Sequence, residues 1–151
     1  MSDPVGVWLG IDVGAARIGV ARCDPREMLA TPVRTVPADA YRHTDLDLLQ
    51  ELLAEHEAVG VVIGLPRTLA GREGSAAQAA RAFGDALQAR APELPIRYVD
   101  ERMTTVLAQR NLTSSGRRGA TKRSVIDQAA AVEILQTFLD GKRRASEQPG
   151  T

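Results

Sequence analysis

The sequence predicts an α/β fold in which three antiparallel strands are extended by two parallel strands and flanked by helices. Two patterns support this prediction. A glycine-containing turn divides the alternating apolar segment of residues 5–23 in the way typical of a β-hairpin. After residue 43, amphipathic helical segments alternate with short apolar strands, as in parallel strands joined by helical crossovers. A length of 151 residues suits one domain.

The first part of the chain supplies the antiparallel strands. Residues 5–13 alternate apolar side chains with smaller or polar ones, and residues 16–23 continue the pattern after a turn at Gly14. A third strand is predicted over residues 29–36, where Pro32 favours a sheet edge because proline cannot donate a ladder hydrogen bond. The first strand is then expected near the centre of the sheet.

The second part of the chain supplies the helices and the parallel strands. Leucines at helical spacing predict an amphipathic helix over residues 44–58, with Thr44 as its N-cap. The later elements are a strand from residue 59 that ends at Gly64, a helix at 75–91 and a strand at 95–101. They are followed by a short helix at 104–112, a glycine-containing basic loop at 113–123 and a final helix at 124–141, ended by Gly141. Residues 1–142 are thus predicted to form one domain, and residues 143–151 a disordered polar tail.

Charge and cysteine content exclude several classes of protein. Lys plus Arg and Asp plus Glu number 19 each, so any basic surface for nucleic acid must be local. The single cysteine, Cys23, excludes an intrachain disulfide framework and a cysteine-based zinc site, but leaves an intersubunit disulfide open. No apolar run approaches the roughly 20 residues that span a bilayer, and no signal-like N-terminus is present. We therefore expect a cytoplasmic protein without a membrane partner.

One carboxylate, Asp12, lies inside an otherwise apolar segment that reads "WLGIDVGAARIGVA". This acid is expected in the middle of the sheet, close to a strand end, where an unpaired charge is costly. Two interpretations fit the local sequence. Asp12 caps the turn at Gly14 through an Asx-type bond, or it binds a cation.

Two further segments carry acids that could join Asp12. Asp100 and Glu101 end the last predicted strand, and strand alternation sends them to opposite faces, so one of them can meet Asp12. Asp127 lies in the final helix and is followed at helical spacing by two alanines, which allow that helix to approach the sheet closely. Three converging carboxylates would repel one another unless divalent cations compensated them. Oxygen ligands of this kind suit Mg²⁺ or Mn²⁺ and are typical of a two-metal phosphodiesterase site.

Each of these acids also has a purely structural interpretation. The acids at the strand end could pair with a neighbouring arginine, Arg97 or Arg102. Asp127 follows Ser124 by three residues, the spacing of a capping box in which the acid returns to the backbone amide of the cap. Only the combination of three acids favours a metal site.

Basic residues near these acids could hold phosphates. Arg17 lies close to Asp12 in the sequence, and the basic loop before the final helix contributes Arg117, Arg118, Lys122 and Arg123. An ordinary solvated loop is the alternative. Aromatic residues are few, which argues against extensive stacking on bases.

Four segments in order resemble the successive motifs of the YqgF/RuvX family, described as Holliday junction resolvases and as pre-16S rRNA processing nucleases. They read "GIDVGAARIGVA", "VVIGLPRTLAGREGSAA", "VDERMTTVLAQ" and "RSVIDQAAAVEILQTFLD", and the resemblance extends from about Val7 to Gly141. It implies an RNase H-like fold and catalytic, metal-binding acids at Asp12, Glu101 and Asp127. The "DER" pattern selects Glu101 over its neighbouring aspartate.

The resemblance also implies the chemistry and the partners. The family's motif arginine falls on Arg17 and its "GLP" loop on Gly64 to Pro66, whereas residues 67–69 depart from many relatives. The implied reaction is attack of a metal-activated water on a phosphodiester, with two Mg²⁺ or Mn²⁺ ions as cofactors. The implied substrate is an rRNA precursor, branched DNA or both, and the endo- or exonuclease mode and the preferred metal stay open.

Assembly and two other classes of function also stay open. A junction resolvase needs a two-fold dimer, but the sequence has no strong dimer signal, so a monomer or weak homodimer is expected. A non-catalytic RNA-binding factor could use the same basic loop while the acids serve structure. The first motif also resembles the phosphate-binding turn of actin-like ATPases. Such proteins need two lobes to bind a nucleotide, so a single lobe of 151 residues argues against this function.

Overall fold

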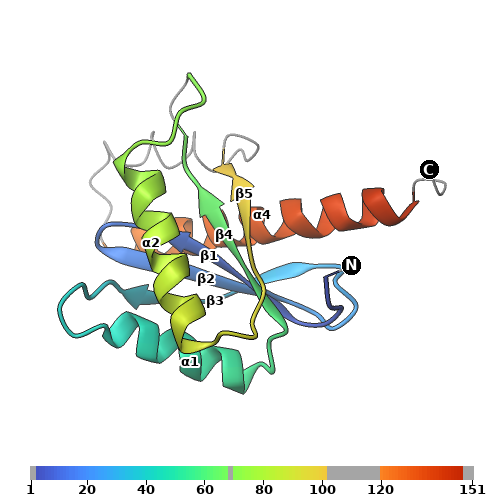
Figure 1. The fold of residues 1–151 in the computed structure, drawn as a ribbon, viewed down its shortest axis with the longest axis horizontal. Helices are drawn as coiled ribbons and strands as arrows, with labels where there is room; N and C mark the ends of the chain where they lie inside the picture. The colour runs from blue at the N-terminus through green and yellow to red at the C-terminus, as the bar shows by residue number, and fades with distance from the viewer. Residues whose placement is uncertain (1–2, 68–69, 102–119, 148–151) are drawn as a thin grey trace.

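The computed structural model describes residues 3–67, 70–101 and 120–147, which form a five-stranded sheet covered by helices on both faces (Figure 1). The strands are β1 (Trp8–Val13), β2 (Arg17–Cys23), β3 (Ala30–Pro37), β4 (Gly60–Leu65) and β5 (Ile96–Asp100). The helices are α1 (Thr44–Glu55), α2 (Ser75–Arg90) and α4 (Ala120–Glu147). Among the described helices, none is both long and apolar enough to cross a membrane.

The strand order is β3-β2-β1-β4-β5, with β1 at the centre. Strands β1, β2 and β3 pair antiparallel, and β4 and β5 extend the sheet in parallel from β1. The predicted mixed sheet is therefore confirmed. Pro32 lies on the edge strand β3, as its missing amide hydrogen predicts.

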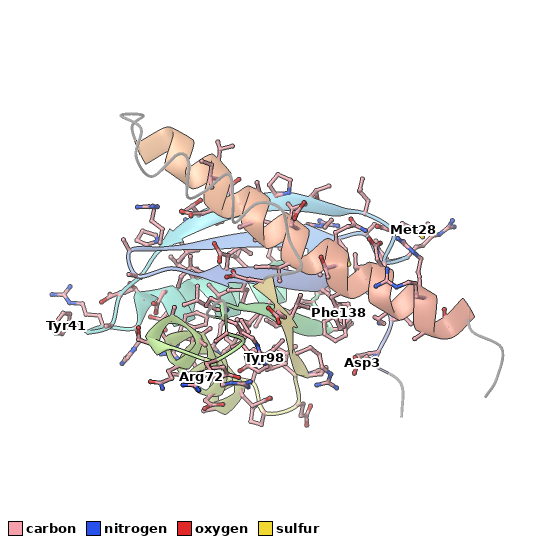
Figure 2. The ribbon with its side chains drawn as sticks, turned by 90° about the horizontal axis from the view of Figure 1, so that it is seen from above. Asp3, Met28, Tyr41, Arg72, Tyr98 and Phe138 are labelled. Atoms are coloured by element: carbon pink, nitrogen blue, oxygen red, sulfur yellow. The ribbon has the colours of Figure 1, made fainter. Side chains whose placement is uncertain are left out.

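Strand alternation divides the core into two layers. Leu9 and Ile11 of β1 pack beneath α1 and α2, together with the buried leucines of those helices. Trp8 faces the opposite way and joins Leu135 and Leu139 of α4. Helix α4 crosses the strands on this second face, as the view from above shows (Figure 2). Because Asp12 has the same parity as Trp8, its side chain points toward the α4 face.

Glycines let α4 lie unusually close to the sheet. A Cβ on Gly10 would lie 2.7 Å from Leu135 Cβ and 2.8 Å from the Ala131 carbonyl oxygen. A Cβ on Gly19 would meet the Asp127 backbone, and one on Gly64 would meet Ile134. Each of the three central strands thus offers bare backbone where the helix passes. The small residues expected in α4 allow the same approach from the other side.

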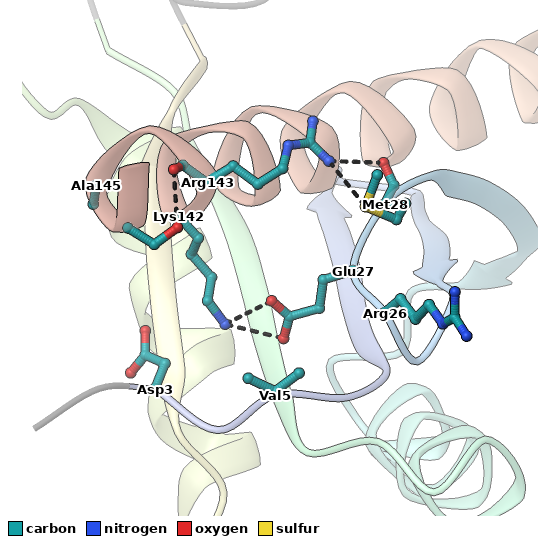
Figure 3. A pocket seen from close by; sticks show the side chains of 9 residues that line it. Asp3, Val5, Arg26, Glu27, Met28, Lys142, Arg143 and Ala145 are labelled. Atoms are coloured by element: carbon teal, nitrogen blue, oxygen red, sulfur yellow. Dashed lines mark hydrogen bonds and ion pairs between the residues drawn. The ribbon is translucent and has the colours of Figure 1, made fainter. Parts of the chain in front are cut away.

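The C-terminal half of α4 is tied to the start of the sheet through Glu27. This buried carboxylate accepts hydrogen bonds from the Gly6 amide at 3.1 Å and from the Trp8 indole N–H at 3.0 Å. Lys142 Nζ lies 2.9 Å from the other Glu27 oxygen, and its cation lies 5.1 Å from the centre of the Trp8 ring. Figure 3 shows this contact between α4 and the turn before β3. The position of α4 along the sheet is therefore fixed at this end.

The ends of two helices differ from the predictions. His43, in a left-handed conformation with φ 57°, is the N-cap of α1, and Thr44 donates its hydroxyl to Asp39 Oδ2 at 2.7 Å instead of capping. Helix α4 begins at Ala120, before Ser124, and continues through Gly141 to Glu147. The predicted stop at Gly141 is wrong, and residues 143–147, expected in a disordered tail, belong to α4.

Tertiary contacts explain the longer α4. Continuing the helix past Gly141 brings Lys142 onto Glu27 and lets Arg143 pair with Asp140 one turn earlier. These contacts outweigh the low helix propensity of glycine. The predicted short helix at 104–112 and residues 113–119 of the basic loop lie outside the described residues, as do residues 148–151 of the predicted tail.

Two glycine-to-alanine substitutions test the close approach of α4. Gly10→Ala should lower the free energy of unfolding by about 1–3 kcal/mol, because the new methyl group overlaps α4. Gly141→Ala is the matched control, since a Cβ there meets nothing within 4 Å. It should raise stability by about 0.5–1 kcal/mol through helix propensity. Urea unfolding followed by circular dichroism measures both, and equal effects would contradict tight packing at Gly10.

Candidate functional site

Asp12 lies near the end of β1 and is 4% exposed. Its antiparallel partner on β2 is Gly19. On the other side Ile11 pairs with Ile63, so the next residue of β4 beside Asp12 is Gly64. Both neighbours on this face are glycines, which leaves room for other side chains to approach the Asp12 carboxylate from either side. The Gly14 amide donates to the Arg17 carbonyl at 2.9 Å, so the hairpin turn has its own backbone bond.

Glu101 approaches from the β4 side. This residue follows the last residue of β5 and is 4% exposed. Its Oε1 atom lies 2.8 Å from where a Cβ on Gly64 would be, so the carboxyl group rests on that glycine. Val99 belongs to the α4-side core, and alternation places Glu101 on the same face as Asp12. Asp100 points the other way and lies 3.7 Å from Arg67.

Asp127 approaches from the β2 side. Its backbone lies against Gly19, the residue paired with Asp12. Its Oδ2 atom accepts a hydrogen bond from Arg17 Nε at 2.8 Å, and the two side chains are 13% and 34% exposed. Because α4 begins at Ala120, Ser124 is not the N-cap and the capping-box interpretation of Asp127 is wrong.

The structure thus brings the three predicted acids to one end of one sheet face. It does not close them into a single cluster. In the part of the chain that the structure describes, no group of three or more His, Cys, Asp or Glu side chains is arranged to hold a metal ion. Asp127 is paired with Arg17 instead. The donor set nevertheless suits a hard divalent cation, because Mg²⁺ is commonly held by one or two carboxylates with water and phosphate oxygens completing the shell.

The predicted phosphate-binding residues are described only in part. Arg17 begins β2 and contacts Asp127, as given above. Lys122 and Arg123 belong to the N-terminal part of α4, the end of the helix nearer to Asp127. Arg117 and Arg118 lie outside the described residues. A cationic helix start therefore lies in the same segment as the third acid.

A group of charged residues around Asp100, on the sheet face opposite to that of Glu101, was not predicted. Arg67 lies between Asp100 and Glu73, with N to O distances of 3.7 Å and 3.6 Å. Arg81 binds Glu73 through two hydrogen bonds of 2.7 Å, which hold the pKa of Glu73 below its usual range. The available sequence signal was an arginine directly after "GLP", at the carboxyl end of a parallel strand, where ligands of α/β proteins bind. Arg97, proposed as a partner for the strand-end acids, pairs with Asp3 instead.

The opposite end of the sheet holds a different set of residues. A pocket of about 570 Å³ there is lined in part by Glu27, Met28 and Lys142, and none of the predicted acids lines it (Figure 3). Cys23 is fully buried nearby, where its Sγ accepts from the Trp8 amide at 3.3 Å and burial raises the pKa of the thiol. A thiol in this position cannot reach a partner subunit, so the structure gives no support to an intersubunit disulfide.

Solved structures with the same fold include two of RuvC from Thermus thermophilus. One, in complex with a Holliday junction substrate, has a TM-score of 0.56 and 14% identity, covering 96% of this chain and 99% of that chain. The second has a TM-score of 0.52 and 11% identity, covering 91% and 96%. These similarities establish the RNase H-like fold that the sequence motifs imply.

Sequence comparisons give the family. A relative from Mycobacterium bovis (strain BCG / Pasteur 1173P2) is 56% identical over 141 residues, covering 93% of this chain and 82% of the relative. One from Nocardia farcinica is 52% identical over 150 residues, covering 96% and 83%. Both carry the name "Putative pre-16S rRNA nuclease". The sequence model of the RuvX family, described as Holliday junction resolvase, matches residues 6–141. With a match of this extent, the chain belongs to the RuvX family.

Proposed function

We propose that this protein is a metal-dependent nuclease that hydrolyses phosphodiester bonds in structured nucleic acid. The observation that carries the proposal is the placement of two buried carboxylates, Asp12 and Glu101, on one sheet face, with Asp127 of α4 beside them. Membership of the RuvX family and the names of the relatives support a nuclease. The same names make an rRNA precursor and branched DNA the substrates to test.

The acids have distinct roles in this proposal. Asp12 and Glu101 would hold Mg²⁺ or Mn²⁺ from the sheet, where burial fixes their side chains, and Asp127 would be the third ligand from α4. Two bound ions would supply an activated water and stabilise the leaving oxygen. Arg17 holds Asp127 beside the site through their hydrogen bond before a metal binds, and adds positive charge where a phosphate would enter.

Binding of the polyanion would use residues around the acids. Arg17 begins β2 and pairs with Asp127, and Lys122 and Arg123 belong to α4, the helix that carries Asp127. Arg117 and Arg118 extend the same basic segment in the sequence. Contacts of this kind go to phosphates, so they would tolerate many sequences and position the strand without reading it.

Metal dependence is the first test of this function. A labelled rRNA precursor and a four-way DNA junction should each be cut when Mn²⁺ or Mg²⁺ is added, and chelator should abolish cutting. Ca²⁺ should support binding with little cleavage because its coordination is larger and looser. Gel analysis of the products also gives the endo- or exonuclease mode. Cleavage that persists in chelator would rule out this mechanism.

The same assay tests substrate and assembly. We expect the RNA precursor to be cut by a monomer or weak dimer, whose state sedimentation measures in the same buffer. A stable dimer that makes paired symmetric nicks in the junction and leaves the RNA intact would instead make this protein a junction resolvase. Binding of RNA without cleavage in any metal would favour the non-catalytic RNA-binding factor.

Substitution of the two sheet acids tests their role directly. Asp12→Asn and Glu101→Gln should each abolish cleavage, because each would remove a metal ligand. In the absence of metal their melting temperatures should stay equal to that of the wild type or rise slightly, since like charges held together without metal oppose folding. Thermal unfolding in chelator and cleavage in Mn²⁺ measure the two effects. If either variant fails to fold, the substituted acid has a structural role and is not a metal ligand.

Asp127 and Arg17 form a matched pair of substitutions. If Asp127 serves only the ion pair, Asp127→Asn and Arg17→Gln should lose similar amounts of stability, about 1 kcal/mol or less for a partly exposed pair, and similar amounts of activity. As a metal ligand, Asp127 is needed for chemistry itself. We then expect Asp127→Asn to lower kcat about a hundredfold or more, while Arg17→Gln mainly raises KM. If the two substitutions lower kcat equally, the only role left for Asp127 is its ion pair with Arg17.

A further inference from the structure

Arg67 is held beside the candidate site by charge more than by hydrogen bonds. The residue follows the end of β4, and its side chain is 31% exposed. Its Nη2 lies 3.6 Å from Glu73 Oε2, and its Nε lies 3.7 Å from Asp100 Oδ2. Both distances exceed those of a good hydrogen bond. Arg67 Nε is buried and finds no hydrogen-bond partner among the residues that the structure describes.

The guanidinium group of Arg67 therefore has donors to spare. Among the described residues it makes one hydrogen bond, from Nη1 to the Gly71 carbonyl at 3.2 Å, out of the five N–H bonds that an arginine offers. A buried donor without a partner is costly, so a ligand that accepts from it would be favoured. The guanidinium fork matches the oxygens of a phosphate.

One acidic neighbour of Arg67, Glu73, is fixed more firmly than Arg67 itself. Glu73, at the start of the segment leading into α2, is clamped by two hydrogen bonds of 2.7 Å from Arg81. Arg81 in turn lies 4.9 Å from the centre of the Tyr98 ring on β5. Glu73 can thus stay in place while Arg67 moves, because its carboxylate keeps the bidentate partner.

The location of Arg67 ties it to the candidate site. Asp100, one of its two acidic neighbours, directly precedes Glu101, and the Glu101 carboxyl group rests on Gly64 of the strand that leads to Arg67. Arg67 therefore lies at the carboxyl ends of two adjacent parallel strands, β4 and β5, on the α2 side of the sheet, whereas Asp12 and Glu101 face α4 at the same ends. A polynucleotide with one phosphate at Asp12 and Glu101 would pass the ends of these strands.

We propose that Arg67 binds a phosphate of the nucleic acid next to the bond that is cut, exchanging its long contacts with Asp100 and Glu73 for charge-assisted hydrogen bonds to phosphate oxygens. The proposal rests on the nuclease function proposed above. Arg67 is then a substrate-binding residue on the β4–β5 side, opposite the Arg17 side of the acids. Glu73 is a positioning residue that holds the guanidinium at the site before substrate arrives.

The salt dependence of binding tests this proposal. A labelled four-way DNA junction is titrated with the wild type and with Arg67→Gln in Ca²⁺, at a series of salt concentrations, and Kd is read from fluorescence anisotropy. The logarithm of the association constant falls linearly with the logarithm of the salt concentration. Loss of one phosphate contact should make this negative slope shallower by about 0.9. It should also raise Kd about tenfold at low salt. An unchanged slope would overturn the proposal.

Two variants separate a phosphate contact from a general charge effect. Arg97→Gln removes the same charge from the other end of β5, where Arg97 pairs with Asp3, and should leave the slope as in the wild type. Arg67→Lys keeps the charge without the fork, so the slope should be kept while Kd rises. Equal slopes for Arg67→Gln and Arg97→Gln would contradict the assignment. If Arg67→Gln does not fold, Arg67→Lys provides the test, and an unchanged Kd for that variant would contradict the assignment.

This measurement does not depend on cleavage. A wild type that binds the junction with the predicted Arg67 contribution but cuts nothing in Mn²⁺ would overturn the nuclease function and keep Arg67 as a phosphate-binding residue. A wild type that cleaves while Arg67→Gln binds with an unchanged slope would overturn only the role of Arg67. Circular dichroism of each variant confirms that folded proteins are compared.

Discussion

The close approach of α4 to the central strands is the constraint on which the site depends. Gly10, Gly19 and Gly64 present bare backbone to the helix, and a methyl group on any of them would meet α4 or the Glu101 side chain. The approach is stabilised by burial of apolar side chains such as Trp8 and Leu135 between the helix and the sheet. With larger residues at these positions, the acids of the helix and the sheet would be held farther apart.

The two halves of α4 have different roles: the C-terminal half anchors the helix to the sheet, and the N-terminal half carries Asp127. At its C-terminal half, Lys142 and Glu27 join the helix to the start of β1, and Trp8 lies beneath the contact. Glu27 adopts a left-handed backbone conformation with φ 60°, which is costly for a residue with a side chain. Hydrogen bonds to its buried carboxylate offset that cost. The opposite half then carries Asp127 to a fixed place above Gly19.

Much of the fold could be predicted because the spacing of apolar residues along the sequence indicates the strands and helices. Alternation gave the strands, and the missing amide of Pro32 placed β3 at the edge. The ends of the final helix could not be predicted in this way. Gly141 is a typical helix stop, and the contact of Lys142 with Glu27, 115 residues away in the sequence, helps to explain why the helix continues.

The candidate site shows the same limit. Acids at strand ends could be recognised from their position, and strand parity explains why Glu101 shares a face with Asp12. Asp127 invited a capping interpretation because Ser124 is close in sequence, whereas its actual partner, Arg17, is 110 residues away. The contacts of Arg67 with Glu73 and Asp100 join the end of β4 to the segment just before α2 and to β5, so no local pattern predicts them.

The central claim is that the sheet acids Asp12 and Glu101 hold a catalytic metal ion against α4. The most direct measurement is an anomalous difference map from crystals grown with Mn²⁺ and a nucleic acid that cannot be cut. The account predicts a Mn²⁺ peak bonded to both carboxylates, with Asp127 turned from Arg17 toward the ion. A peak elsewhere on the protein, or none beside Asp12 and Glu101, would contradict it.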